Sequence, residues 1–209
     1  MLVLSILGVI ILVVGGIFFF INYAKNGSKK MSYIIMIVGL LVAGGAYGIN
    51  AYQIKQEQIR QARIKKNKES NFENNYSNIN YYASKTGIVA EKIGDKYSKV
   101  WHDAIWDDSV TVNGKIYTNF SKAVAAQTEV FILDGTAPKM ENNLKKLNST
   151  YSYLKKNLTN KNVEKLATAK QTVKDTKSFV NLVENPSGNY STFNNNLSEA
   201  DSTLSTDIQ

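Results

Sequence analysis

Residues 2–21 form a run of twenty residues without a single charged side chain. As an α-helix, a run of this length is about 30 Å long, which matches the hydrocarbon core of a bilayer. No basic residue precedes it, and Phe18, Phe19 and Phe20 end it where a cleaved signal peptide would have small residues. The sequence therefore predicts an uncleaved transmembrane helix over residues 1–22.

A second uncharged run covers residues 32–52. It follows a short polar linker, residues 23–31, whose Asn-Gly pair and neighbouring Ser are typical of a turn. Two apolar runs joined by so short a linker must lie antiparallel. We therefore expect residues 32–52 to be a second transmembrane helix that forms a hairpin with the first.

Glycines in both runs are candidates for close helix packing. Gly44 and Gly48 form a GxxxG pair, and small residues four apart let membrane helices approach closely. Gly8 and Gly15 offer a matching groove on the first run. Packing within the hairpin accounts for these four glycines, and a homo-oligomer formed through the membrane helices is the alternative.

Residues 53–70 contain no Pro or Gly and are strongly basic. Residues 1–70 hold nine of the 25 Lys and Arg residues but only two of the 17 acids. Such a segment next to a membrane helix is attracted to anionic lipid headgroups, so we expect a helical juxtamembrane stalk with lipid as a partner. The side chains expected to contact the headgroups are Lys55, Arg60, Arg63, Lys65 and Lys66.

Residues 71–209 show the periodicity of a helical bundle. Apolar residues recur every three or four positions from Phe72 to Ala104, which predicts a helix with one buried face, although two glycines weaken it locally. Four further helices are expected. They run from Asn119 or Ser121 to Leu133, from Pro138 to Leu158, from Asn160 or Asn162 to just before Pro186, and from Tyr190 to Ile208.

One short segment is typical of strands. Val110–Val112 and Lys115–Tyr117 flank Asn113-Gly114, which is the strongest two-residue signal for a β-hairpin. A wholly irregular loop is the alternative. The predicted fold class is therefore all-α: a two-helix transmembrane hairpin, followed by an antiparallel bundle of about five helices with one small β-hairpin.

Few residues carry catalytic chemistry. The chain has no Cys and one His, His102, so thiolate chemistry is excluded and a metal site would lack a second imidazole. Asp103, Asp107 and Asp108 form an acidic cluster that could hold a cation, but solvated acids at a helix end are commoner. The segment beyond residue 70 has no Arg and a nearly balanced charge, which disfavours nucleic acid. We expect no catalytic site, cofactor or metal.

Two short motifs carry a resemblance. The motifs are Trp101-x-x-x-Ile105, followed by Trp106 and later by Phe120, and Asn-Pro186-Ser-Gly188, followed by Phe193. Through them residues 72–209 resemble a family of membrane-tethered helical domains from Firmicutes and their mobile elements. The resemblance implies a domain held at the membrane by lipid or by transmembrane segments, outside the cytoplasm. It transfers no catalytic residue.

Both motifs also have a purely structural interpretation. Pro186 ends one helix, Gly188 allows a positive φ, and the next residue can cap the following helix. Trp101 and Ile105 share a helix face, and two tryptophans near a helix end usually anchor a core.

The orientation in the membrane is not decided by charge. Three lysines between the spans favour a cytoplasmic linker, whereas the basic stalk favours a cytoplasmic domain. The polar, Arg-free composition of the large domain and the family resemblance favour the outside. We therefore expect a two-span protein of a bacterial cell membrane with an extracytoplasmic C-terminal domain.

Three functions remain open from the sequence. The first is a membrane-anchored, non-enzymatic domain that binds a protein or cell-envelope partner, for example in phage exclusion or protection against a toxin. The second is a holin-like or pore-forming protein, suggested by the glycine-bearing spans. The third is a sensor, which would need a separate output partner.

Overall fold

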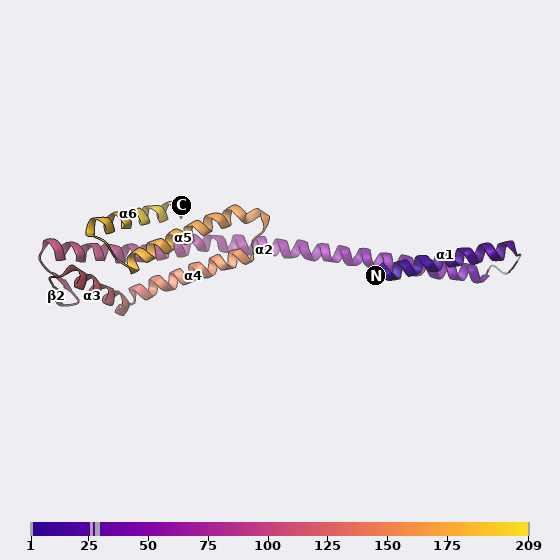
Figure 1. Cartoon of the computed structure of the whole chain (residues 1–209), viewed down its shortest axis with the longest axis horizontal. Helices are drawn as coiled ribbons and strands as arrows, with labels where there is room; N and C mark the ends of the chain where they lie inside the picture. The colour runs from indigo at the N-terminus through magenta and orange to yellow at the C-terminus, as the bar shows by residue number, and fades with distance from the viewer. Residues whose placement is uncertain (1, 26, 28–29, 209) are drawn as a thin grey trace. The chain divides into compact units, whose positions relative to one another are not determined.

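The computed structural model describes residues 2–25, 27 and 30–208 (Figure 1). It divides into two compact units, one ending at Lys65 and the other starting at Lys66. Helix α2, Lys30–Trp106, belongs to both. The predicted all-α class with one small hairpin is confirmed. Apart from two short strands, β1 and β2, the elements of the described residues are helical.

The first unit pairs helix α1, Leu2–Ala24, with the beginning of α2. The two helices pack closely at glycines. A Cβ added to Gly8 would lie 2.5 Å from the backbone nitrogen of Ala43, and one added to Gly39 would lie 2.8 Å from that of Leu12. Gly15 is similarly close to Met36. Only hydrogen fits at these positions, so the antiparallel contact depends on the glycines.

Gly44 and Gly48 do not take part in that contact, contrary to the expectation that they match Gly8 and Gly15. A Cβ at either position would meet nothing within 4 Å. The reason is their position around the helix. α2 faces α1 with Met36, Gly39 and Ala43, and Gly44, the residue after Ala43, points about 100° away from that face. Packing against α1 therefore does not account for these two glycines, and the homo-oligomer through the membrane helices stays a prediction.

The predicted pair of membrane spans is supported only in part. Among the described residues, Ile6–Ala24 is the one helix long and apolar enough to cross a membrane. The predicted span at 32–52 is not supported, because the apolar stretch of α2 covers only Lys30–Gly45. That stretch is shorter than the roughly 20 residues that a span needs.

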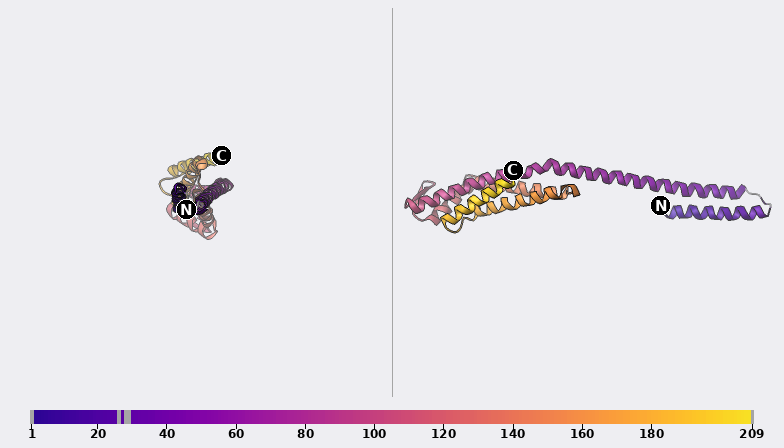
Figure 2. Two further views of the ribbon diagram at one scale, coloured as in Figure 1. Left: turned by 90° about the vertical axis from the view of Figure 1, so that its right-hand side faces the viewer. Right: turned by 90° about the horizontal axis from the view of Figure 1, so that it is seen from above.

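The second unit is a helical bundle built along the remainder of α2. Figures 1 and 2 show α5 and α6 running alongside this helix. The elements after α2 are β1 (Val110–Val112), β2 (Lys115–Tyr117), α3 (Phe120–Leu133), α4 (Thr136–Lys156), the 3-10 turn η1 (Asn160–Asn162), α5 (Val163–Glu184) and α6 (Tyr190–Asp207).

The core of the bundle is the periodic stripe of α2 and the residues that cover it. Phe72, Ile79 and Tyr97 of this stripe are almost completely buried, as the spacing predicts. The side chains packed into the same cluster from α3, α4, α5 and α6 include Phe131, Met140, Leu147, Leu154, Phe179, Val183, Phe193, Leu197 and Leu204. Five helices, α2 and the four that cover it, thus bury their apolar faces in one core.

Local signals in the sequence set the ends of several elements. Asn113 and Gly114 both have positive φ, 46° and 76°, which is the type I′ geometry that joins two short antiparallel strands. Asn119 caps α3 by accepting a hydrogen bond from the backbone N–H of Lys122 at 3.0 Å. Asn189 caps α6 in the same way, after Gly188 at φ 88°.

Two glycines of α2 make room for α6. A Cβ on Gly87 would lie 2.7 Å from Leu204, and one on Gly94 would overlap Leu197. The two glycines are seven residues apart and their leucines are also seven apart, so the same contact repeats after two turns. Glycine is a poor helix former, so both positions lower the intrinsic stability of α2 but allow α6 to pack closely against it.

We expect Gly94→Ile to destabilise the bundle by about 1–3 kcal/mol, because the new side chain must displace Leu197 from a packed core. Leu197→Ala in the same chain should recover part of that loss, since it removes the overlapping atoms. Urea unfolding followed by circular dichroism, arranged as a double-mutant cycle, measures both effects. Additive losses would show that the glycine does not serve this contact.

Candidate functional site

The motif residues meet at one end of the bundle. Figure 1 shows the hairpin and the start of α3 at the end of α2, near the start of α6. Trp101, only 3% exposed, stacks on Phe120 of α3 with ring centroids 5.6 Å apart and contacts Phe193 of α6 at the same distance. Pro186 and Gly188 lie in the connection that leads into α6. This inner cluster ties three helices together.

A second aromatic layer lies outside the first. Trp106 is 57% exposed, stacks on His102 at 4.8 Å and meets Tyr190 edge to face at 5.0 Å. We call His102, Trp106 and Tyr190 the aromatic tip. The expectation that both tryptophans anchor the core is therefore right for Trp101 and wrong for Trp106. Ile105, expected on the same face as Trp101, is also exposed, because the last turn of α2 extends beyond its covering helices.

Tyr190 is the tip residue that the sequence did not single out. It was visible only as the first apolar residue of the α6 stripe. The sequence signal that could have identified Tyr190 is its position directly after the NPSGN turn. This turn places the first residue of α6 beside the end of α2.

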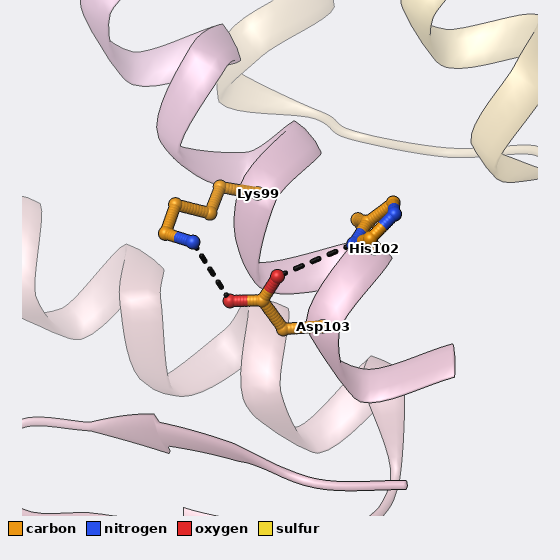
Figure 3. Close-up of polar contacts among 3 residues, drawn as sticks. All are labelled: Lys99, His102 and Asp103. Carbon is orange, nitrogen blue, oxygen red and sulfur yellow. Dashed lines mark hydrogen bonds and ion pairs between the residues drawn. The ribbon is translucent and has the colours of Figure 1, made fainter. Parts of the chain in front are cut away.

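Charged side chains surround the tip. Figure 3 shows Lys99 and His102 approaching Asp103 from different sides of α2. Lys99 Nζ lies 3.1 Å from one carboxylate oxygen and His102 Nδ1 lies 3.3 Å from the other. Partial burial acts to raise the pKa of Asp103, but the hydrogen bonds from Lys99 and His102 outweigh it and lower the pKa below its usual value. Asp103 is therefore ionised at neutral pH.

The same residues are the place where a metal ion would be sought. His102, Asp103 and Asp107 offer ligand atoms within 4.8 Å of one another. Both oxygens of Asp103 are already engaged by Lys99 and His102, and His102 and Asp107 are exposed to water. The arrangement is that of solvated helix-end acids, which are common without a bound ion.

A groove of about 790 Å³ lies between α2, α3 and the hairpin, and its lining does not include the residues of the aromatic tip. Val112 and Phe131 form part of its apolar floor, and lysines of α2 line one wall. Asp134 lies across from them, and hydrogen bonds from Thr136 lower the pKa of this carboxyl, with a smaller contribution from Lys92. Positive and negative groups alternate around the groove, so its charge does not define a ligand.

The side chains predicted to contact lipid headgroups are all on α2 and all exposed: Lys55, Arg60, Arg63, Lys65 and Lys66. Arg60 is 3.7 Å from Glu57. An exposed pair of this kind is worth little and leaves the charge available. Contact of these side chains with lipid headgroups stays a prediction.

No family model, curated protein or solved structure matches this chain. The family resemblance carried by the two motifs therefore stays a prediction. The geometry at the end of the bundle is the basis on which a function can be argued.

The two tryptophans should differ sharply when they are replaced. We expect Trp101→Ala to lower the free energy of unfolding by about 3–5 kcal/mol, since it empties a buried aromatic site. Trp106→Ala should cost about 1 kcal/mol or less, because most of its ring is in water. Chemical unfolding of both variants, followed by circular dichroism, makes the comparison. Equal losses would mean that Trp106 is a structural residue.

Proposed function

We propose that this chain is a membrane-anchored, non-enzymatic helical domain that binds a protein or cell-envelope partner through its aromatic tip. The observation that carries the proposal is the exposure of Trp106 beside Tyr190. Trp and Tyr are enriched among the residues that dominate binding energy at protein interfaces. When a partner covers a large exposed aromatic side chain, burial of the ring contributes strongly to the free energy of binding.

Further apolar side chains are exposed at the same end of the bundle. Ile105 is 43% exposed and Phe120 is 39% exposed, and both come from elements that meet at the end of α2. Scattered exposed apolar residues are normal, but neighbouring ones at the end of a bundle indicate an interaction site. Phage exclusion or protection against a toxin is the biological setting that we propose for such a domain.

The anchoring part of the proposal begins with the apolar helix Ile6–Ala24. We propose that α1 crosses the membrane with the apolar start of α2 packed against it, that the basic side chains near Arg60 contact lipid headgroups, and that the bundle is extracytoplasmic. The close glycine contacts between α1 and α2 support an antiparallel pair in the membrane.

The binding proposal is tested by capture from a cell-envelope extract with the full chain in a maltoside detergent. We expect Trp106→Ala and Tyr190→Ala each to abolish most of the capture of one defined partner. Tyr153→Ala, which removes an exposed tyrosine from α4, is the matched control and should capture normally. If all variants capture the same proteins equally, the aromatic tip is not a binding site.

The orientation is tested by labelling. The chain has no Cys, so Ser152→Cys places one thiol on an exposed position of α4. A membrane-impermeant maleimide should label this variant in intact cells to the same extent as in lysed cells. Labelling that requires lysis would place the bundle in the cytoplasm. The basic stalk would then contact the inner leaflet.

A further inference from the structure

We infer that the partner presents a cationic side chain, lysine or arginine, that lies against Trp106 and pairs with Asp107 and Asp108. This inference rests on the proposed function and names the chemistry of the group that the aromatic tip recognises. It is drawn from the ring geometry, from the acids that follow Trp106 and from the position of all of them at the end of a helix.

The rings form an open aromatic corner. The planes of Trp106 and Tyr190 are 71° apart, with centroids separated by 5.0 Å. His102 lies nearly parallel to Trp106, at 28°, and covers part of it. More than half of Trp106 is still exposed. A cation placed over an aromatic face is attracted to its π electrons, and tryptophan is the strongest such ring.

The charges at the corner are complementary to a cation. Asp107 and Asp108 follow Trp106 directly and are exposed, and neither forms an ion pair with any residue that the structure describes. Asp103 nearby is already paired with Lys99. Two exposed carboxylates without an ion-pair partner among the described residues thus follow the exposed ring in the chain, and that of Asp107 lies within 4.8 Å of a ligand nitrogen of His102.

The helix adds to this field. α2 ends at Trp106, and the carbonyl groups of a helix C-terminus carry a partial negative charge that favours cations. No basic residue lies in the last turn of α2 to neutralise it. An acidic partner would be repelled by the same groups, and a purely apolar partner would leave two aspartates buried without a counter-charge.

The test uses the two tryptophans as separate reporters. Full-length protein labelled with 5-fluorotryptophan, in maltoside detergent, should give two fluorine signals, which Trp106→Phe assigns. We expect tri-arginine amide to shift the Trp106 signal saturably and to leave the buried Trp101 signal in place. Tri-citrulline amide, which has nearly the same shape but lacks the three guanidinium charges, should have little effect. Equal shifts with both peptides, or none with tri-arginine, would overturn the inference.

Charge-removing variants provide the second readout. Asp107→Asn with Asp108→Asn should weaken tri-arginine binding by about two- to five-fold, the range expected for an exposed cation–aromatic site that loses its carboxylates. Asp95→Asn, at an exposed position on the same helix, is the matched control and should bind normally. A Trp106 shift produced by Ca²⁺ alone, without one from tri-arginine, would assign the acids to a metal ion and reject the inference.

The inference and the proposed function fail in different ways. If capture of the envelope partner depends on Trp106 but tri-arginine causes no shift, the tip binds a partner of other chemistry and only the inference is lost. If tri-arginine binds as expected but no partner is captured, the cationic preference of the tip stands and the proposed function is lost.

Discussion

Burial of one helical stripe holds the second unit together. From Phe72 to Ala104, α2 places an apolar or small side chain toward the core at every third or fourth residue, and α3, α4, α5 and α6 add their own apolar faces to it. Each large side chain removed from water contributes about 1.5–3 kcal/mol, so the stripe dominates the stability of the bundle. Gly87 and Gly94 interrupt the stripe because α6 must approach there, and its leucines occupy the space.

The aromatic tip is a consequence of where that stripe ends. Trp101 is still covered, by Phe120 and Phe193, and it joins three elements. Trp106 lies five residues later, which rotates it by about 140° around the helix, and it comes at the last residue of α2. It therefore points away from the core, where Tyr190 and His102 contact it without burying it. The inner cluster holds the outer one in place, and a preorganised surface of this kind lowers the entropic cost of the proposed binding.

Much of the bundle could be predicted from local patterns. The periodicity of α2 identified its buried face, Asn113-Gly114 identified the hairpin, and Asn119 and Pro186 marked helix ends. The membrane part was predicted less well. The second apolar stretch is too short for a span, and Gly44 points away from α1 although Gly8 packs against α2. The spacing of small residues along one helix shows where close packing is possible. Which of them lie in the contact depends on the face that the neighbouring helix covers.

The sequence by itself determined the helical class, the hairpin, the first apolar helix and the face of α2 that becomes buried, because these follow from contacts between residues close in the chain. Tertiary structure alone decided that Tyr190 lies against Trp106, that Trp101 is covered by Phe120 and Phe193, and that Leu197 fills the space at Gly94. Periodicity shows that one face of a helix will be buried, but the residues that bury it come from distant parts of the chain. The exposed corner at Trp106 exists because nothing in the described part of the bundle extends far enough to cover it.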